Sequence, residues 1–191
     1  FTLKVNNIEH ILQSSEDLKG KVLIANHPTL IDIVILISII KNADCIVKND
    51  LKSNPFITGV IRGTGYISNI NPEDLLQDCH TSLQQGQVLI IFPEGTRTVP
   101  GKQLTFLRGA ANIAIRCQSH FLPVVIDCYP DFLIKGRKWY QIPPSRPRIE
   151  MTLHPQLNID EYIYTQSSNI AARKLTHTIE HYFREQVSPH E

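Results

Sequence analysis

Short runs rich in β-branched residues recur along this chain, and helix-like segments separate them. Alternation of this kind is typical of a sheet covered by helices. The predicted fold class is therefore α/β: a single domain with a mostly parallel central sheet and helices on both faces. The predicted strands are 21–25, 44–48, 64–68, 88–92, 121–127 and 148–153.

Capping residues and apolar spacing locate the helices between these strands. Asn71-Pro72 provides an N-cap followed by a proline at the first helical position, and Gly86 ends that helix. The segment 106–117 carries alanines that permit close approach to a sheet, which predicts a second helix. The segment 168–187 has apolar residues at helical spacing and predicts a helix packed on the core.

Size, charge and cysteine spacing limit the class of protein. With 191 residues, of which 42% are hydrophobic, the chain can fill one core but not two, so 1–191 are predicted to form one domain. A net charge of +1 provides no field that would attract nucleic acid. The four cysteines show no CxxC spacing, which predicts buried, reduced thiols and suits a cytosolic face. The sequence carries no indication of oligomeric state.

The chain contains no segment that could cross a bilayer. Its longest apolar run, 33–40, has eight residues, whereas a span takes about 20. The chain begins at Phe1 rather than at a methionine, so we expect a piece of a longer protein, with room for a membrane anchor upstream.

The first motif, Asn26-His27-Pro28-Thr29-Leu30-Ile31-Asp32, places a histidine and a carboxylate five positions apart after an apolar run. Pro28 favours a helix start, so a helix is predicted from here, with Asn26 or His27 as its cap. Five residues rise about 7–8 Å along a helix, so Asp32 can reach an imidazole folded back over the first turns. A carboxylate on one ring nitrogen fixes the tautomer, and the other nitrogen can then act as a general base. A capping asparagine beside an incidental histidine is the alternative for this motif alone.

The second motif, Phe92-Pro93-Glu94-Gly95-Thr96-Arg97, follows the run 88–92, where open α/β sheets place their ligand crevice. Gly95 permits a backbone N–H to approach an anion closely, and Arg97 offers a fork of donors to phosphate or carboxylate. The alternative is a Pro-Gly turn closed by a surface ion pair.

In this order the two motifs resemble those of the lysophospholipid and glycerol-phosphate acyltransferase family, the 1-acylglycerol-3-phosphate acyltransferases in particular. The resemblance covers about 22–125. It implies an α/β fold and a role in phospholipid biosynthesis: transfer of a fatty acyl group from acyl-CoA or acyl carrier protein to a lysophospholipid hydroxyl. His27 would be the base and Asp32 its partner, with no covalent intermediate, no metal and no cofactor besides the acyl donor. The implied substrate-binding residues are Asn26, Lys48, Arg62, Glu94, Gly95, Thr96, Arg97 and Arg108.

One block departs from the family pattern. After a glycine-aromatic-aliphatic run the family commonly has an aspartate and an arginine, and the arginine is credited with holding the acceptor phosphate. Here Gly65-Tyr66-Ile67 is followed by Ser68-Asn69. Arg62 is the nearby cation that could substitute, and a lipid other than lysophosphatidic acid stays open as the acceptor.

The segment 132–148 combines five cations with Trp139-Tyr140 and contains no acid. Tryptophan and tyrosine favour the headgroup level of a bilayer, and cations attract anionic lipid. The predicted membrane contact consists of Lys135, Arg137, Lys138, Trp139 and Tyr140. The predicted location is the cytoplasmic face of a membrane, held peripherally or by an upstream anchor. Docking of an acidic acyl carrier protein and a solvated loop with one buried tryptophan are the alternatives.

Other motif-based functions do not fit. The chain has no Gly-x-Ser-x-Gly elbow, which argues against a serine hydrolase. The glycine-to-lysine spacing of 95–102 is one residue too long for a P-loop, and Gln103 stands where serine or threonine is needed. The remaining alternatives are an acyl-thioesterase, with water as the acceptor, and a non-catalytic module that binds lipid or acyl carrier protein.

Overall fold

A computed structural model of the chain describes residues 4–6, 17–47, 65–68, 72–164 and 167–187. Its centre is a seven-stranded sheet in the order β1-β7-β6-β2-β5-β3-β4. The strands are β1 (Lys4–Asn6), β2 (Val22–Ala25), β3 (Ala43–Val47), β4 (Gly65–Ser68), β5 (Val88–Ile91), β6 (Phe121–Tyr129) and β7 (Arg148–Leu153). Among these strands only β6 and β7 pair antiparallel, so the predicted, mostly parallel sheet is confirmed.

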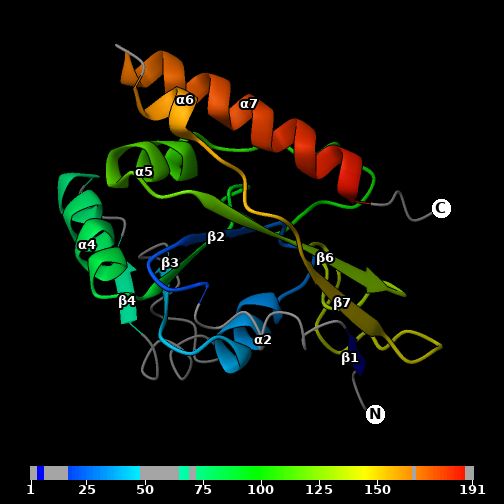
Figure 1. Cartoon of the computed structure of the whole chain (residues 1–191). Coiled ribbons are helices and arrows are strands. Elements are labelled where there is room, and N and C mark those ends of the chain that lie inside the picture. Colours follow the sequence, from blue (N-terminus) through cyan, green and yellow to red (C-terminus); the bar gives the residue numbers. More distant parts are fainter. Residues whose placement is uncertain (1–3, 7–16, 48–64, 69–71, 165–166, 188–191) are drawn as a thin grey trace.

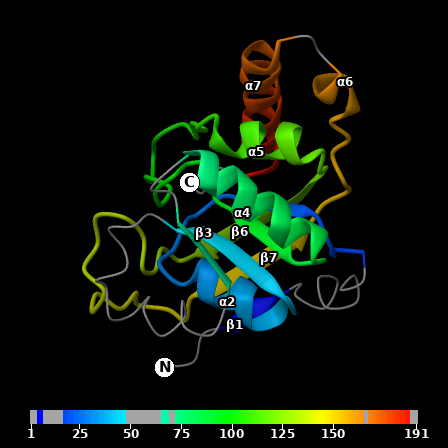
Figure 2. The same cartoon turned by 90° about the vertical axis from the view of Figure 1, so that its left-hand side faces the viewer.

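Helices cover both faces of the sheet, as predicted, but unequally (Figures 1 and 2). One face carries α4 (Pro72–Gln84), α5 (Gly109–Cys117) and α7 (Ser168–Gln186), with the short α6 (Asp160–Ile163) beside α7. The other face carries α2 (Asp32–Ile39). Each face has its own hydrophobic cluster, so the sheet is the middle of three layers.

The side chains of β2 contribute to the hydrophobic clusters on both faces of the sheet. All four of its residues are buried. Successive side chains of a strand point to opposite faces, so Val22 and Ile24 join the cluster below α5 and α7, whereas Leu23 and Ala25 join the cluster against α2. A strand with one face in water would need polar residues at alternate positions. The continuous apolar run therefore belongs at the centre of the sheet.

The prediction that a helix begins directly after His27 is wrong, because α2 begins at Asp32. The Leu30 N–H is donated to the carbonyl oxygen of Leu133 at 3.0 Å, and Thr29 forms a β-bridge with Ile134. Pairing with this distant segment engages the backbone of Thr29 and Leu30, and the helix starts one turn later, at Asp32.

α5 also begins later than predicted, at Gly109 rather than at residue 106. The Phe106 N–H is donated to the carboxylate of Glu180 on α7 at 2.7 Å, and the Leu107 N–H to the Pro93 carbonyl oxygen at 2.8 Å. The N–H groups of Phe106 and Leu107 are thus used in bonds to distant residues, so residues 106–108 belong to the loop before α5. The two elements that the sequence did not predict, β1 and α6, have three and four residues, too few for a periodic pattern.

The four cysteines are free thiols, and Cys45, Cys79 and Cys128 are buried, as predicted. Burial raises the pKa of the Cys45 and Cys79 thiols to about 12 and that of Cys128 to about 11. Thiols of such high pKa are protonated at neutral pH and therefore poorly nucleophilic. Their role in this fold is to fill the core.

Replacing Phe183 with alanine should lower the free energy of unfolding by about 3–5 kcal/mol, because it leaves a cavity below α7. Phe183 is fully buried, and its ring meets that of Phe106 edge to face with centroids 5.3 Å apart. Urea unfolding followed by circular dichroism measures the change. Ile170→Ala on the same helix is the control, since Ile170 is 45% exposed; equal losses in the two variants would contradict this packing of α7.

Candidate active site

The two motifs leave the sheet at the same edge, because β2 and β5 are neighbouring parallel strands. Ile24 pairs with Ile91, so continuing this register by three residues sets His27 opposite Glu94. Hydrogen bonds of the His27 backbone confirm that the two motifs lie side by side. The His27 N–H is donated to Glu94 Oε1 at 2.9 Å, and the His27 carbonyl oxygen accepts the Thr98 N–H at 2.7 Å.

His27 has the geometry of a general base held by a carboxylate. Its Nδ1 lies 2.9 Å from Oδ2 of Asp32. A carboxylate accepts hydrogen bonds, so this contact places a proton on Nδ1, and in the neutral imidazole Nε2 is the acceptor nitrogen. No residue in the described part of the chain hydrogen-bonds Nε2. The ring stacks on Phe92 with centroids 4.2 Å apart, and 18% of the side chain is exposed, which leaves Nε2 access to a substrate.

Asp32 is fully buried, and donors satisfy both of its oxygens. Oδ2 accepts the Thr29 N–H at 2.7 Å in addition to the imidazole, and Oδ1 accepts the Thr29 hydroxyl. As the first residue of α2, Asp32 also lies at the positive end of a helix. A buried carboxylate without such partners would be costly. With them the carboxylate is held in place and fixes the imidazole in one tautomer.

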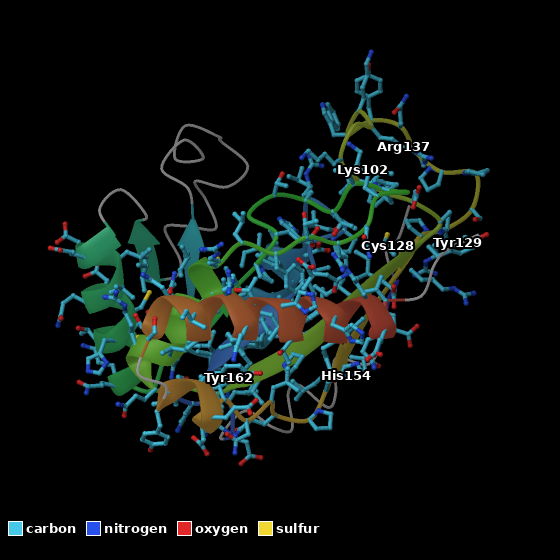
Figure 3. The ribbon with its side chains drawn as sticks, turned by 90° about the horizontal axis from the view of Figure 1, so that it is seen from above. Lys102, Cys128, Tyr129, Arg137, His154 and Tyr162 are labelled. Carbon is cyan, nitrogen blue, oxygen red and sulfur yellow. The ribbon has the colours of Figure 1, made fainter. Side chains whose placement is uncertain are left out.

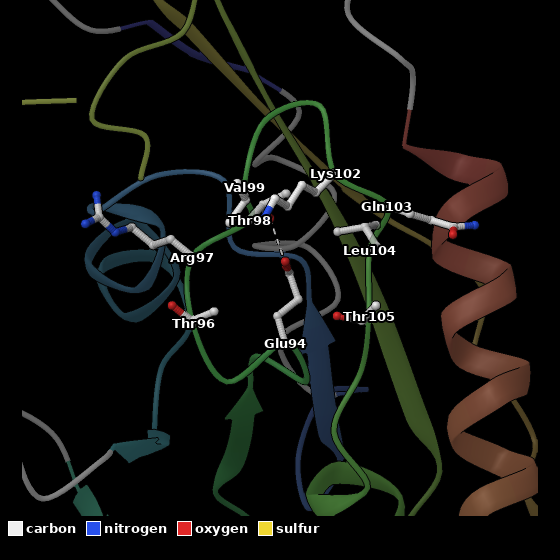
Figure 4. A pocket seen from close by; sticks show the side chains of 9 residues that line it. All are labelled: Glu94, Thr96, Arg97, Thr98, Val99, Lys102, Gln103, Leu104 and Thr105. Carbon is white, nitrogen blue, oxygen red and sulfur yellow. Dashed lines mark hydrogen bonds between the residues drawn. The ribbon is translucent and has the colours of Figure 1, made fainter. Parts of the chain in front are cut away.

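Glu94 is turned into the protein and ties the second motif to the first (Figure 4). Its Oε1 accepts the His27 N–H and, at 2.8 Å, the Thr98 hydroxyl. Burial raises the pKa of Glu94 above its ordinary value, and these two hydrogen bonds limit the rise. The geometry thus gives Glu94 the role of closing a loop and does not support the predicted substrate contact.

Thr96 and Arg97 lie on the outer side of this loop (Figure 4). Arg97 points away from the loop interior and donates Nη1–H to the carbonyl oxygen of Leu133 at 3.0 Å. The Thr96 hydroxyl accepts a hydrogen bond from Nζ of Lys135 at 3.0 Å. The guanidinium and the ammonium keep further donors, so positive charge lies next to the second motif.

The β5–α5 loop (92–108) encloses a hollow of about 90 Å³. Ligand pockets have volumes of roughly 300–1,000 Å³, so this hollow cannot hold a lipid. Its lining residues are Glu94, Thr96, Arg97, Thr98, Val99, Lys102, Gln103, Leu104 and Thr105.

Gly95 serves the turn. Its φ is +64°, in the left-handed region, and its N–H is donated to the Phe92 carbonyl oxygen at 3.0 Å. A Cβ at this position would lie 2.5 Å from Cδ1 of Leu107. The N–H of Gly95 itself is therefore used inside the turn, and the approach of another backbone N–H near Gly95 to an anion stays a prediction.

The side chain of Asn26 is buried, with 1% of the residue exposed, and it makes hydrogen bonds to β6 of the kind that a strand backbone makes. Its Nδ2 donates to the Ile126 carbonyl oxygen at 2.7 Å, and its Oδ1 accepts the Ile126 N–H at 2.8 Å. This pairing extends the contact of β2 with β6 by one residue and fixes the start of the first motif. It makes Asn26 a structural residue and gives no support to the predicted substrate contact or helix cap.

Residues 2–127, more than half of the chain, match the family model described as Acyltransferase. The chain belongs to this family. It is 37% identical over 134 residues to the 1-acyl-sn-glycerol-3-phosphate acyltransferase of Helicobacter pylori, a match that covers 66% of this chain and 55% of that relative. It is 40% identical over 58 residues to the 1-acyl-sn-glycerol-3-phosphate acyltransferase alpha of Homo sapiens, which covers 30% of this chain and 20% of the human protein.

A solved structure has the same fold as this acyltransferase-family chain. It is the 1-acyl-sn-glycerophosphate (LPA) acyltransferase, PlsC, from Thermotoga maritima, with a TM-score of 0.67 and 23% sequence identity. The match covers 98% of this chain and 73% of that chain. The chain itself spans about half the length of the Helicobacter pylori relative.

The structure does not test three of the predicted substrate contacts. Lys48 and Arg62 lie outside the described residues, as does the family departure at Asn69. Arg108 is exposed directly before α5, and among the described residues its side chain has no hydrogen-bond or ion-pair partner. Its substrate contact stays a prediction. The described residues contain no cluster of three or more His, Cys, Asp or Glu that could hold a metal ion.

Two residues that hold the β5–α5 loop were not predicted from the sequence. Arg184 on α7 donates to the Leu104 carbonyl oxygen from Nε at 3.0 Å and from Nη2 at 2.6 Å. It also pairs at 2.6 Å with Glu180, whose other oxygen accepts the Phe106 N–H. A Glu–Arg spacing of four is common on exposed helices, so the sequence carries no specific signal for this role.

The raised pKa of Glu94 predicts how the stability of the protein changes with pH. The folded state keeps a proton on Glu94 to higher pH than the unfolded chain does, so stability falls as pH rises from the ordinary carboxyl pKa through the raised one. Glu94→Gln removes this titration and retains an oxygen to accept the His27 N–H. The free energy of unfolding of this variant, relative to wild type, should therefore rise across that window.

Urea unfolding at a series of pH values measures this difference. Glu185→Gln, at a position 60% exposed on α7, is the control and should show a small, nearly constant difference. A Glu94→Gln difference that is equally flat would contradict the burial of this carboxyl group.

Proposed function

We propose that the chain is the catalytic part of a glycerolipid O-acyltransferase that moves a fatty acyl group from acyl-CoA or acyl carrier protein to a lysophospholipid hydroxyl. The observation that carries this proposal is the 2.9 Å contact between His27 Nδ1 and Asp32, which orients the imidazole beside the second motif. Membership in the Acyltransferase family supports the reaction class. Relatives named 1-acyl-sn-glycerol-3-phosphate acyltransferase support a lysophosphatidic acid-type acceptor.

In the proposed reaction Nε2 of His27 takes the proton of the acceptor hydroxyl as its oxygen attacks the thioester carbonyl carbon. A C–O bond forms, the C–S bond breaks, and the leaving thiolate receives the proton from the imidazolium. Asp32 stabilises the imidazolium in the interval. The acceptor attacks the donor directly, so no acyl-enzyme is formed.

The cations beside the second motif suit an anionic part of the substrates. Arg97 is held at one end by the Leu133 carbonyl oxygen, which leaves the other guanidinium N–H groups for a phosphate or for the oxyanion. Lys135 lies one hydrogen bond away from Thr96, within the same motif. We assign the acceptor headgroup to this side of the loop, with Arg97 and Thr96 as its contacts.

Replacing His27 with alanine should lower kcat for acyl transfer by roughly 10²–10⁴-fold, because it removes the general base. Release of free thiol from acyl-CoA or acyl carrier protein, with lysophosphatidic acid present, measures the rate. His181→Ala on α7, at a position 64% exposed, is the control and should retain wild-type activity. A His27→Ala variant with most of the activity would remove the basis of this proposal.

Titration of the acceptor separates the alternatives. Thiol release that rises with lysophosphatidic acid, together with diacyl product in the mass spectrum, is expected. Release at the same rate without any acceptor would make the protein a thioesterase. Binding of lipid or acyl carrier protein without thiol release from the wild type would make it a non-catalytic module.

We further propose that the β6–β7 connection (130–147) contacts a membrane on its cytoplasmic face. Its aromatic and aliphatic side chains are unusually open: Trp139 is 69%, Ile142 65% and Tyr140 56% exposed. The prediction of a buried tryptophan, the alternative for this segment, is thereby excluded. Lys135, Arg137 and Lys138 are exposed beside them. None of the described helices is long and apolar enough to span a bilayer.

The connection is joined to both motifs near its start. The Leu133 carbonyl oxygen accepts hydrogen bonds from the Leu30 N–H and from Arg97, and Lys135 reaches Thr96. In Figure 3 Arg137, on this connection, and Lys102, on the β5–α5 loop, lie toward the same end of the molecule. A bilayer bound there would present its lipids close to the second motif.

Lys138→Gln should weaken binding to vesicles that contain anionic lipid by about 5-fold, since a cation near such a surface contributes about 1 kcal/mol. Trp139→Ala should weaken binding to anionic and zwitterionic vesicles alike, because it removes apolar contact area. Sedimentation with vesicles measures both, and Lys174→Gln on α7 is the control. Unchanged vesicle binding with reduced affinity for acyl carrier protein would assign the surface to the carrier instead.

A further inference from the structure

Thr29 lies between His27 and Asp32 in the first motif, and its side chain is fully buried. It contacts the carboxylate of Asp32 twice: its N–H is donated to Oδ2 at 2.7 Å, and its hydroxyl is hydrogen-bonded to Oδ1. The two carboxylate oxygens therefore have different partners. Oδ2 meets the imidazole and the Thr29 N–H, whereas Oδ1 meets the Thr29 hydroxyl.

The direction of the hydroxyl bond follows from the neighbouring groups. Thr29 Oγ1 accepts the Ile31 N–H at 3.3 Å, so its lone pairs face the backbone. The ionised carboxylate of Asp32 has no proton to offer. The Thr29 O–H is therefore the donor, and a hydrogen bond to a charged acceptor is worth more than one between neutral groups.

The backbone of Thr29 is held from outside the motif. Thr29 forms a β-bridge with Ile134, and the next N–H, that of Leu30, is donated to the Leu133 carbonyl oxygen. This pairing is the reason that α2 starts at Asp32 and that Asp32 can fold back onto Thr29. The donor pair of Thr29 is thus set by tertiary structure before any substrate binds.

We propose that Thr29 is a positioning residue of the His27–Asp32 pair: its N–H and hydroxyl orient the carboxylate so that Oδ2 faces Nδ1 of His27 and keep it ionised. The proposal rests on the proposed function, in which His27 is the base. In this role Thr29 does not touch substrate. It acts through Asp32 on the imidazolium that forms as the acceptor loses its proton.

Loss of the hydroxyl should change the pH dependence of the reaction. The active state has an ionised Asp32 and an imidazole without a proton on Nε2. Without the donor on Oδ1, a proton on the carboxyl group and a proton on the imidazole both become more favourable, since less of the negative charge is compensated. Both effects move the acidic limb of the kcat/KM profile to higher pH.

Among the described residues, two other titratable groups interact with Asp32, and neither is changed by a substitution at Thr29. Glu94 lies across the motifs with a raised pKa, and Cys128 on β6 has a thiol pKa of about 11, so it is protonated in the acidic range. A Glu94→Gln background removes the titration of Glu94. The shift caused by the Thr29 substitution should be the same in that background.

The experiment compares Thr29→Val, which keeps the shape and removes the hydroxyl, with Thr29→Ser, which keeps the hydroxyl. Both are measured in the full chain by thiol release with lysophosphatidic acid across a pH series. Thr29→Val should lower kcat/KM by roughly 10- to 100-fold, move the acidic limb upward and leave KM for the acceptor unchanged. Thr29→Ser should stay within about 3-fold of wild type, a margin of under 1 kcal/mol, and keep its profile.

Thr176→Val is the matched control, because Thr176 is another buried threonine with a hydrogen-bonded hydroxyl. Its hydroxyl donates to the backbone carbonyl oxygen of Ala172 at 2.7 Å and not to a carboxylate. This substitution should leave the rate and the profile unchanged. A Thr29→Val variant with the wild-type profile and a rate within about 2-fold of wild type, half a kcal/mol or less, would overturn the proposal. If Thr29→Val behaves like wild type and His27→Ala is inactive, only the role of Thr29 is overturned. If His27→Ala is active, the proposed function is overturned.

Circular dichroism and thermal unfolding show whether Thr29→Val is folded. If it is not, Thr29→Cys against Thr29→Ser makes the same comparison, since a thiol is a weak donor in the same place. Equal rates and profiles in these two variants would also overturn the proposal.

Discussion

The parallel pairing of β2 with β5 is the constraint on which the site depends. Each strand ends at the same edge of the sheet, and the register Ile24–Ile91 carries His27 to the position opposite Glu94. A register slip of one residue would turn the side chains of β2 to the other face and separate the motifs. The continuous apolar sequence of both strands, buried on both faces, prevents such a slip by anchoring them between two hydrophobic clusters.

Hydrogen bonds to other elements hold both motifs in place. Asn26 bonds the backbone of Ile126 on β6, and Thr29 and Leu30 pair with the start of the β6–β7 connection. The end of the β5–α5 loop is hydrogen-bonded to α7. The imidazole and its carboxylate are therefore oriented before any substrate binds, which is the condition for an efficient base. α7 lies outside the residues 2–127 that match the family model, yet it holds a loop of the second motif.

The elements that could be predicted are those whose local pattern favours one kind of secondary structure. A four-residue run such as 88–91, apolar at every position and rich in β-branched residues, favours a strand with both faces covered, and the structure has one there. The sequence also predicted that His27 and Asp32 would pair, and the 2.9 Å contact is present in the structure. It placed the start of two helices too early, because N–H groups that an isolated helix would use are donated to Leu133 and to Glu180 instead. Such competition between local and distant acceptors is invisible in a linear pattern.

The sequence alone determined the fold class, the two motifs and the family, because these depend on periodicity, burial and residue identity at short spacing. Tertiary structure alone decided what each residue of the motifs does. The Gly95 N–H closes a turn, and Glu94 accepts the His27 N–H, two contacts that the sequence did not predict. The physical reason is that a polar group binds whichever partner the fold brings within about 3 Å, and strands far apart in sequence supply those partners.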